Sequence, residues 1–128
     1  MELLPLEEAV IRHALAGTHP VLEALRDQWR QAAATVREAS GKGVFVTIEV
    51  PDTTKALTTV YRVTIADVVV DLPGEPEAIG AVLFVDYGKI AMLELYAFEG
   101  AWPSDVSGFR VRYAHDPRTL ESLNRVEV

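Results

Sequence analysis

Apolar residues in the first third of the chain recur every third or fourth position, which is the period of an amphipathic helix. One such stripe runs over residues 6–15 and a second over residues 22–36. Pro5 and Pro20 each fit the first position of a helix, where the missing backbone N–H carries no penalty. We therefore predict a helical hairpin over residues 1–41.

From Val44 onward, apolar residues recur at every second position, which predicts strands. The expected strands cover residues 44–50, about 58–72, 79–86, 89–98 and 109–113. The second of these is too long for one flat strand, so we expect a bend or a bulge near Ala66-Asp67. Tyr87-Gly88, between the third and fourth strands, predicts a tight hairpin turn in which Gly88 supplies a positive φ.

This order of elements predicts an α+β fold, with two N-terminal helices packed on an antiparallel sheet of about five strands and a short C-terminal helix. The short helix would follow Asp116-Pro117 and carry Leu120 and Leu123. A length of 128 residues fits one hydrophobic core. The expected single domain, residues 1–128, divides into a helical hairpin (1–41), an antiparallel sheet (43–114) and a C-terminal extension (115–128).

The hairpin around Tyr87-Gly88 is apolar on both faces. A two-residue turn without a bulge would pair Val85 with Ile90, Leu83 with Met92, and Ala81 with Glu94. One face would then carry Val82, Phe84, Ala91, Leu93, Leu95 and Ala97, and the other Ala81, Leu83, Val85, Ile90, Met92, Glu94, Tyr96 and Phe98. Antiparallel sheets usually turn one polar face to water, so this pattern is unusual.

Two helices can cover only one face of such a sheet. Leaving the large side chains of the second face in water would forfeit on the order of 10 kcal/mol, because each contributes about 1.5–3 kcal/mol when fully buried. We therefore expect this face to be covered by the C-terminal segment, by a second subunit or by a partner, or else to line a pocket. This expectation depends on the pairing given above.

Glu94 lies in the middle of the second face, between Met92 and Tyr96 in the pleat. A carboxylate there would be desolvated unless a cation or several donors meet it, and such groups cluster at functional sites. The alternatives are a buried salt bridge to Arg62, Arg110 or Arg112, or an edge position that is open to water. The aromatic residues nearby suit either a core or an interface anchor. The candidate ligand- or partner-binding residues are Glu94, Tyr96, Met92, Phe98, Trp102 and Tyr113.

Composition narrows the function classes. The net charge of -7 opposes binding to nucleic acid and favours a basic protein partner or, in the simplest case, only solubility. The chain has no cysteine, which excludes thiolate catalysis and disulfides, and it has no apolar stretch long enough to cross a membrane. Its acidic N-terminal residues do not resemble a secretion signal, so we expect a cytoplasmic protein.

The chain carries no self-contained catalytic or metal-binding motif. His13, His19 and His115 lie in separate segments and lack the spacing of a zinc site, so we predict no metal and no cofactor. His19 fits a helix cap. Ser104 and Ser107 lack the pattern of a nucleophile elbow, and Gly41-Lys42-Gly43 reads as a helix C-cap because it lacks the spacing of a phosphate loop.

The later strands resemble a family of short bacterial proteins without an assigned function. The resemblance rests on Gly80 to Asp86, on Met92-Leu93-Glu94-Leu95-Tyr96, on Trp102-Pro103, and on Phe109 to Tyr113. It extends back through His19 to Leu22 and Val44 to Pro51. Leu95 stands where the family pattern has glycine, and the loop before Trp102 is less acidic. The resemblance implies an α+β fold and an intracellular setting, and it implies no activity.

We predict a non-enzymatic protein-binding domain that acts through the second sheet face or its aromatic and acidic rim, with a protein partner or a homodimer as its occupant. By analogy with other small acidic proteins, its most concrete form is a toxin-neutralising immunity protein or a regulatory protein. The alternative is a small-ligand-binding protein or enzyme with a pocket near Glu94, walled by Tyr96 and Trp102. A structural subunit of a larger complex is a third interpretation, which the sequence does not separate from the first.

Overall fold

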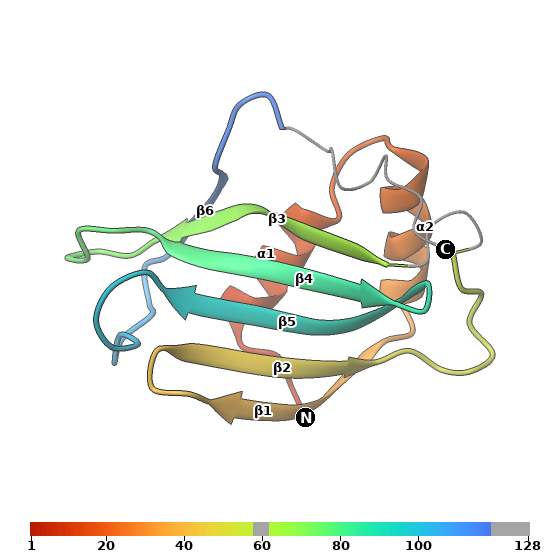
Figure 1. Cartoon of the computed structure of the whole chain (residues 1–128), viewed down its shortest axis with the longest axis horizontal. Helices are drawn as coiled ribbons and strands as arrows, with labels where there is room; N and C mark the ends of the chain where they lie inside the picture. Colours follow the sequence, from red (N-terminus) through yellow and green to blue (C-terminus); the bar gives the residue numbers. More distant parts are fainter. Residues whose placement is uncertain (58–61, 119–128) are drawn as a thin grey trace.

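The computed structural model describes residues 1–57 and 62–118, and within these ranges the chain forms two helices and six strands (Figure 1). The helices are α1 (Pro5–Ala14) and α2 (Pro20–Trp29). The strands are β1 (Ala33–Ala39), β2 (Gly43–Glu49), β3 (Val63–Asp71), β4 (Ile79–Asp86), β5 (Lys89–Ala97) and β6 (Arg110–Tyr113). No described helix has the length and apolar character needed to cross a membrane.

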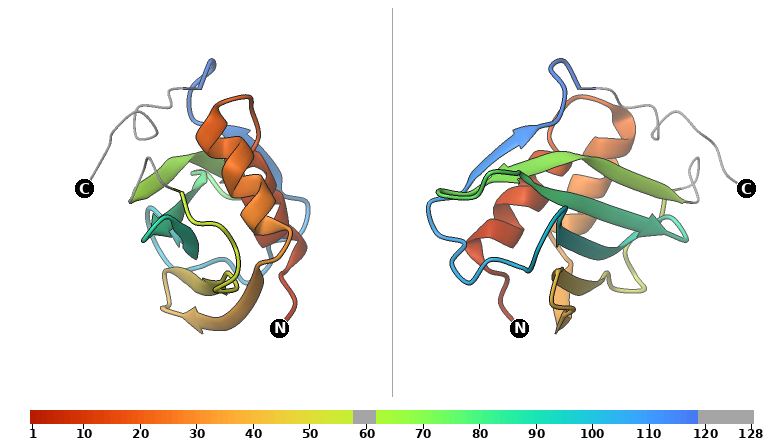
Figure 2. Two further views of the ribbon diagram at one scale, coloured as in Figure 1. Left: turned by 90° about the vertical axis from the view of Figure 1, so that its right-hand side faces the viewer. Right: turned by 60° about the vertical axis from the view of Figure 1, so that its left-hand side comes forward.

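The six strands form one antiparallel sheet in the order β1-β2-β5-β4-β3-β6, and both helices lie against the same face of it (Figures 1 and 2). The α+β fold with two N-terminal helices is therefore confirmed, with six strands where about five were expected. The predicted C-terminal helix, with Leu120 and Leu123, lies outside the described residues beyond Arg118, where the description ends.

The helix starts follow the predicted chemistry. Pro5 opens α1, with Glu7 and Glu8 in its first turn, where the helix dipole favours acids. His19 is the N-cap of α2, and its Nδ1 accepts the backbone N–H of Val21 at 3.1 Å. Apolar side chains from both helices enter the core opposite the sheet.

The second helix is shorter than predicted, and this is a correction. It ends at Trp29, and β1 begins at Ala33 within the segment expected to be helical. Thr35 and Val36 are β-branched and favour a strand, and Ala34 is buried opposite Ile48 of β2. Gly41, with φ of 84°, belongs to the β1–β2 turn. The Gly41-Lys42-Gly43 segment is therefore a hairpin turn and not a helix cap.

The bulge predicted in the long strand is confirmed: the pairing of β3 with β4 shifts between Ile65 and Val68. Asp67, within this bulge, accepts hydrogen bonds from Arg118 at 2.7 and 2.9 Å. Arg118 also donates to the carbonyls of Ala14 and Ala16 at the end of α1. The bulge thus supplies an acid that joins the end of the described chain to the first helix.

The predicted turn at Tyr87-Gly88 is also confirmed, with φ of 53° at Tyr87 and 74° at Gly88. Positive φ at both central residues matches the twist of a tight hairpin. A Cβ at Gly88 would lie 2.7 Å from the carbonyl oxygen of Leu57, so close backbone packing also requires glycine there.

The register beyond this turn differs from the prediction. Val85 pairs with Ile90 as expected, but Phe84 then pairs with Met92, so Ala91 is an extra residue in β5. After the bulge, the side chains of β5 point to the sheet face opposite to the one predicted. Glu94 is therefore paired with Val82 instead of Ala81. The predicted face memberships were therefore wrong from Ala91 onward.

The bulge sorts the side chains of the hairpin into one buried and one open face. Ala81, Leu83 and Val85 of β4 and Ile90, Leu93 and Leu95 of β5 all lie beneath the helices with at most 2% of their surface exposed. Val82, Phe84, Met92, Glu94 and Tyr96 take the opposite face and are half-buried. The second face is still largely apolar, with a membership different from the predicted one.

Candidate functional site

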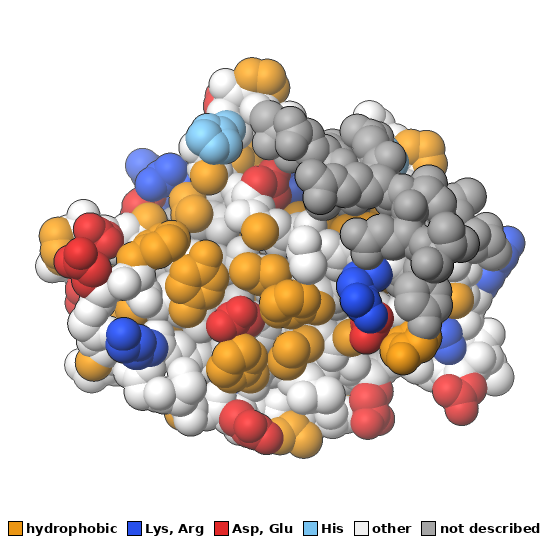
Figure 3. Space-filling model, in the orientation of Figure 1, with side chains coloured by type: hydrophobic (Ala, Val, Ile, Leu, Met, Phe, Trp, Pro, Cys, Tyr) orange, Lys and Arg blue, Asp and Glu red, His pale blue; other side chains and the backbone are white. Residues whose placement is uncertain are grey.

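The candidate site is the open face, which we define as the sheet face opposite α1 and α2. Apolar side chains gather over the middle of this face, with acidic side chains among them (Figure 3). The cross-strand register places these side chains in two central rows. One row carries Phe45, Glu94 and Val82, and the next carries Thr47, Met92 and Phe84.

Four apolar side chains surround Glu94, and we call them the apolar frame. Phe45 of β2 and Val82 of β4 lie across from Glu94 on the neighbouring strands, and Met92 and Tyr96 lie two residues away along β5. All four are half-buried, as is Glu94 itself. The frame exists because β2, β5 and β4 are adjacent and because the bulge at Ala91 puts Met92, Glu94 and Tyr96 on the open face.

The Glu94 carboxylate has no hydrogen-bond or ion-pair partner among residues 1–57 and 62–118. Two of the three arginines expected as its alternatives pair with aspartates instead, and no ion pair joins Arg110 to Glu94 within the described residues. Arg62 donates to Asp86 at 3.2 Å, and Arg112 donates to Asp71 at 2.6 Å. The hydrogen bond from Arg112 lowers the pKa of the Asp71 carboxyl below its ordinary value. The predicted alternative of a buried salt bridge at Glu94 is therefore wrong within the described chain.

Tyr96 lies between two glycines, Gly43 on β2 and Gly80 on β4. A Cβ at Gly80 would be 2.3 Å from Cζ of Tyr96, so the tyrosine ring covers the space that this glycine leaves. The ring meets Phe98 edge-on with centroids 5.1 Å apart, and Phe98 is 54% exposed. The aromatic pair extends the apolar frame toward the end of β5.

Trp102 and Tyr113 do not join this group. Trp102 packs against the core near the β1–β2 turn, where its backbone N–H donates to the Gly41 carbonyl at 2.8 Å. The Tyr113 hydroxyl donates to the carbonyl of His13 in α1 at 2.7 Å, and the Arg118 guanidinium lies 4.3 Å from the ring centroid. Of the six candidates, the structure therefore brings together Glu94, Tyr96, Met92 and Phe98.

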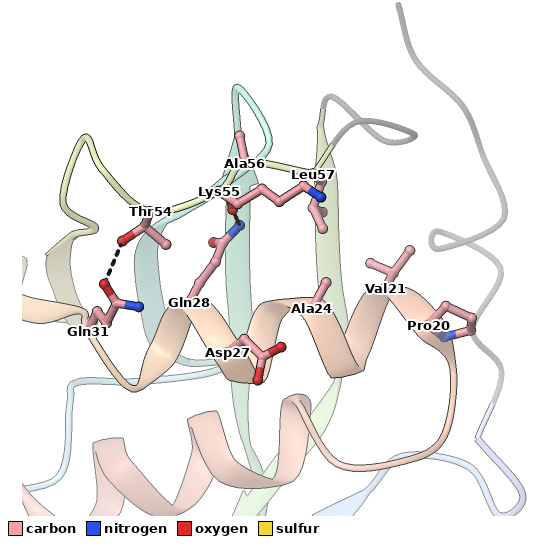
Figure 4. Close-up of a pocket in the computed structure, with 10 residues that line it drawn as sticks. All are labelled: Pro20, Val21, Ala24, Asp27, Gln28, Gln31, Thr54, Lys55, Ala56 and Leu57. Carbon is pink, nitrogen blue, oxygen red and sulfur yellow. Dashed lines mark hydrogen bonds between the residues drawn. The ribbon is translucent and has the colours of Figure 1, made fainter.

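Three hollows at the surface of the described chain lie away from Glu94. The largest, about 410 Å³, is a groove between α2 and residues 54–57 (Figure 4). Gln28 reaches across it from α2, and Gln31, just after the end of the helix, accepts a hydrogen bond from Thr54 at 3.1 Å. A second, about 170 Å³, lies between the start of α1 and Trp102, and a third, about 60 Å³, lies beside Phe98. Glu94 lines none of these three.

The described residues contain no candidate metal site, since no group of three or more His, Asp or Glu side chains among them is placed to hold an ion. His13 and His19 make local contacts in their own helices, since their ring nitrogens lie near the Ala9 carbonyl and the Val21 N–H. The chemistry that the open face offers is therefore recognition by apolar contact around one acid.

Sequence reasoning missed Phe45, Val82 and Phe84 as site residues. Phe45 lies beside Glu94 only through the β2–β5 pairing, which no local pattern gives. Val82 and Phe84 were assigned to the other face because the bulge was not expected. The sequence does carry a signal of the bulge. The large apolar residues Ile90 and Leu93 are three positions apart, whereas Leu93 and Leu95 are two apart as in a regular strand.

No protein-family model, curated protein or solved structure matches this chain. The resemblance to short bacterial proteins stays a prediction, and what the chain does must be inferred from its own residues.

Proposed function

We propose that this chain is a non-enzymatic protein-binding domain that docks a separate protein on the open face. The observation that carries the proposal is the solvent-facing apolar frame with an unpartnered carboxylate at its centre. Contiguous exposed apolar surface on a soluble domain marks an interaction site or an aggregation hazard. A net charge of -7 favours solubility and a partner with complementary charge.

The shape of the face supports a macromolecular partner. Its apolar side chains spread across β2, β5 and β4, and none of the three hollows described above includes Glu94, whereas small-molecule sites are concave and enclose most of the ligand. The alternative of a ligand pocket beside Glu94 has less support for this reason. An immunity protein that neutralises a toxin, or a regulatory subunit, is the concrete form that this proposal takes.

A separate protein suits the face better than a second copy of the chain. Two copies laid face to face would bring together two unpartnered Glu94 carboxylates and two chains of charge -7. Like charges that are desolvated together oppose association. We therefore expect the purified chain to be monomeric.

Position-specific photocrosslinking in the native host tests the proposal. A photoreactive phenylalanine analogue replaces Phe84 on the open face in one variant and Arg12 on the outer side of α1 in the matched control. The expected result is one dominant protein adduct from position 84, weak or absent from position 12, and lost when Glu94→Lys is added. Equal adducts from both positions, an adduct with a second copy of the chain, or no adduct from position 84 would contradict the proposal.

A further inference from the structure

The charges of the open face do not balance at its centre. The arginine–aspartate pairs, Arg62 with Asp86 and Arg112 with Asp71, neutralise each other toward its margins. Glu94, in contrast, has no partner in the described chain, and neither has Glu38, which is opposite Phe45 on β1. The uncompensated charge of the inner rows is therefore negative.

Covering this face changes the solvation of Glu94. A purely apolar partner would remove water from the carboxylate without replacing the lost hydrogen bonds, and burying an unpaired charge is strongly unfavourable. A cation at the same place would reverse the balance because charge-assisted hydrogen bonds are the stronger ones, and a guanidinium can bind both carboxylate oxygens. Phe45 and Tyr96 also place two aromatic residues in the frame around Glu94, and aromatic rings attract cations that lie over their faces.

We infer that the partner docks through an apolar surface that carries one central arginine or lysine, and that this side chain pairs with Glu94. The inference rests on the proposed function, since it names the chemistry of the occupant of the open face. It assigns Glu94 as the residue that selects the partner and the apolar frame as the surface that contributes most of the contact area.

The dimensions of the frame fit an amphipathic helix. Phe45 and Val82 are separated by two strand spacings, about 10 Å. On a helix, residues three or four positions from a central arginine lie on the same side, about 5–6 Å along the axis in each direction. Such a helix can place its basic residue over Glu94 and apolar residues over the frame on both sides.

The test uses two stapled amphipathic helical peptides that differ in one atom group. Each presents leucines around a central residue, which is arginine in one peptide and its neutral isostere citrulline in the other. Each is titrated into the isotopically labelled full chain, and binding is followed through the backbone amide resonances. Glu94→Gln serves as the matched variant, because it keeps the size and polarity of the side chain and removes its charge.

We expect the arginine peptide to bind wild type about tenfold more tightly than the citrulline peptide, with the largest shifts at Met92, Glu94 and Tyr96. Glu94→Gln should bind both peptides equally while its remaining resonances stay those of the folded chain. Equal binding of the two peptides to wild type, a preference that survives in Glu94→Gln, shifts centred elsewhere, or no binding at millimolar peptide would overturn the inference.

The two proposals fail separately. If photocrosslinking from position 84 yields its dominant adduct and Glu94→Gln leaves that adduct unchanged, the basic anchor is wrong while the docking face stands. If position 84 yields no adduct, the docking face itself is wrong. If position 84 yields its adduct in the otherwise unchanged chain and Glu94→Gln weakens or abolishes that adduct, both the docking face and the basic anchor are supported.

Discussion

Replacing Gln28 with alanine should lower the free energy of unfolding by about 3 kcal/mol. Gln28 is buried, with 1% of its surface exposed, and its side-chain amide binds two backbone groups at the turn between β4 and β5. Its Nε2 donates to the Gly88 carbonyl at 2.8 Å, and its Oε1 accepts the N–H of Ile90 at 3.0 Å. The substitution leaves the Ile90 donor without that acceptor, weakens the satisfaction of the Gly88 carbonyl and opens a cavity.

Chemical denaturation of Gln28→Ala and of Gln31→Ala measures this effect. Gln31 lines the same groove just after the end of α2 but is exposed, and it accepts a hydrogen bond from Thr54, so its loss should change stability by less than about 0.5 kcal/mol. Amide hydrogen exchange at Ile90 should accelerate in Gln28→Ala. Equal stability of the two variants would show that Gln28 does not hold the turn.

Gln28 also affects the open face indirectly, through the strand register of β5. Ile90, which it binds, directly precedes the bulged Ala91, and this bulge sends Glu94 to the open face. A helix residue that fixes the start of β5 therefore helps to set the register on the far side of the sheet.

Arg37→Met should destabilise the fold by about 3 kcal/mol, and more than Glu7→Gln, for which we expect about 1–2 kcal/mol. Arg37 of β1 donates through Nε to Glu7 of α1 at 2.8 Å, and its Nη2 donates to the other carboxylate oxygen. The Glu7 side chain is 1% exposed and that of Arg37 is 26% exposed. This pair joins the edge strand to the first helix.

Arg37→Met should destabilise the fold more than Glu7→Gln because Glu7 is the more deeply buried partner of the pair. Without Arg37, the carboxylate of Glu7 stays buried with the N–H of Leu4 as its remaining partner. Without the charge of Glu7, the arginine can still reach water and the carbonyl of Glu2. The double variant Glu7→Gln, Arg37→Met should therefore recover stability relative to Arg37→Met alone. Purely additive losses, measured by a double-mutant cycle, would contradict this account.

Much of the fold could be predicted because its signals are local. Proline at helix starts, the change of apolar period near Val44 and the Tyr87-Gly88 turn each depend on neighbouring residues alone. The bulge near Ala66-Asp67 followed from strand length. β1 was missed because Ala32 to Ala34 favour a helix, whereas its pairing with β2 and the contact of Arg37 with Glu7 hold this segment as a strand.

The site was predicted in part for the same reason. The residues Met92, Glu94 and Tyr96 share a face in any register, since they alternate along one strand. Their neighbours on other strands depend on the bulge at Ala91, which involves Gln28 from a distant helix. Trp102 and Tyr113 pack against the helix side through contacts with Gly41 and His13, which sequence spacing does not reveal.

The position of Glu94 on the open face can be measured directly by cross-strand NOEs between the backbone protons of β4 and β5 in the purified chain. We expect contacts that pair Glu94 with Val82 and Leu93 with Leu83, as the bulge at Ala91 requires. Contacts that instead pair Glu94 with Ala81 and Met92 with Leu83 would turn Glu94 toward the helices. That result would contradict the open face as the binding surface.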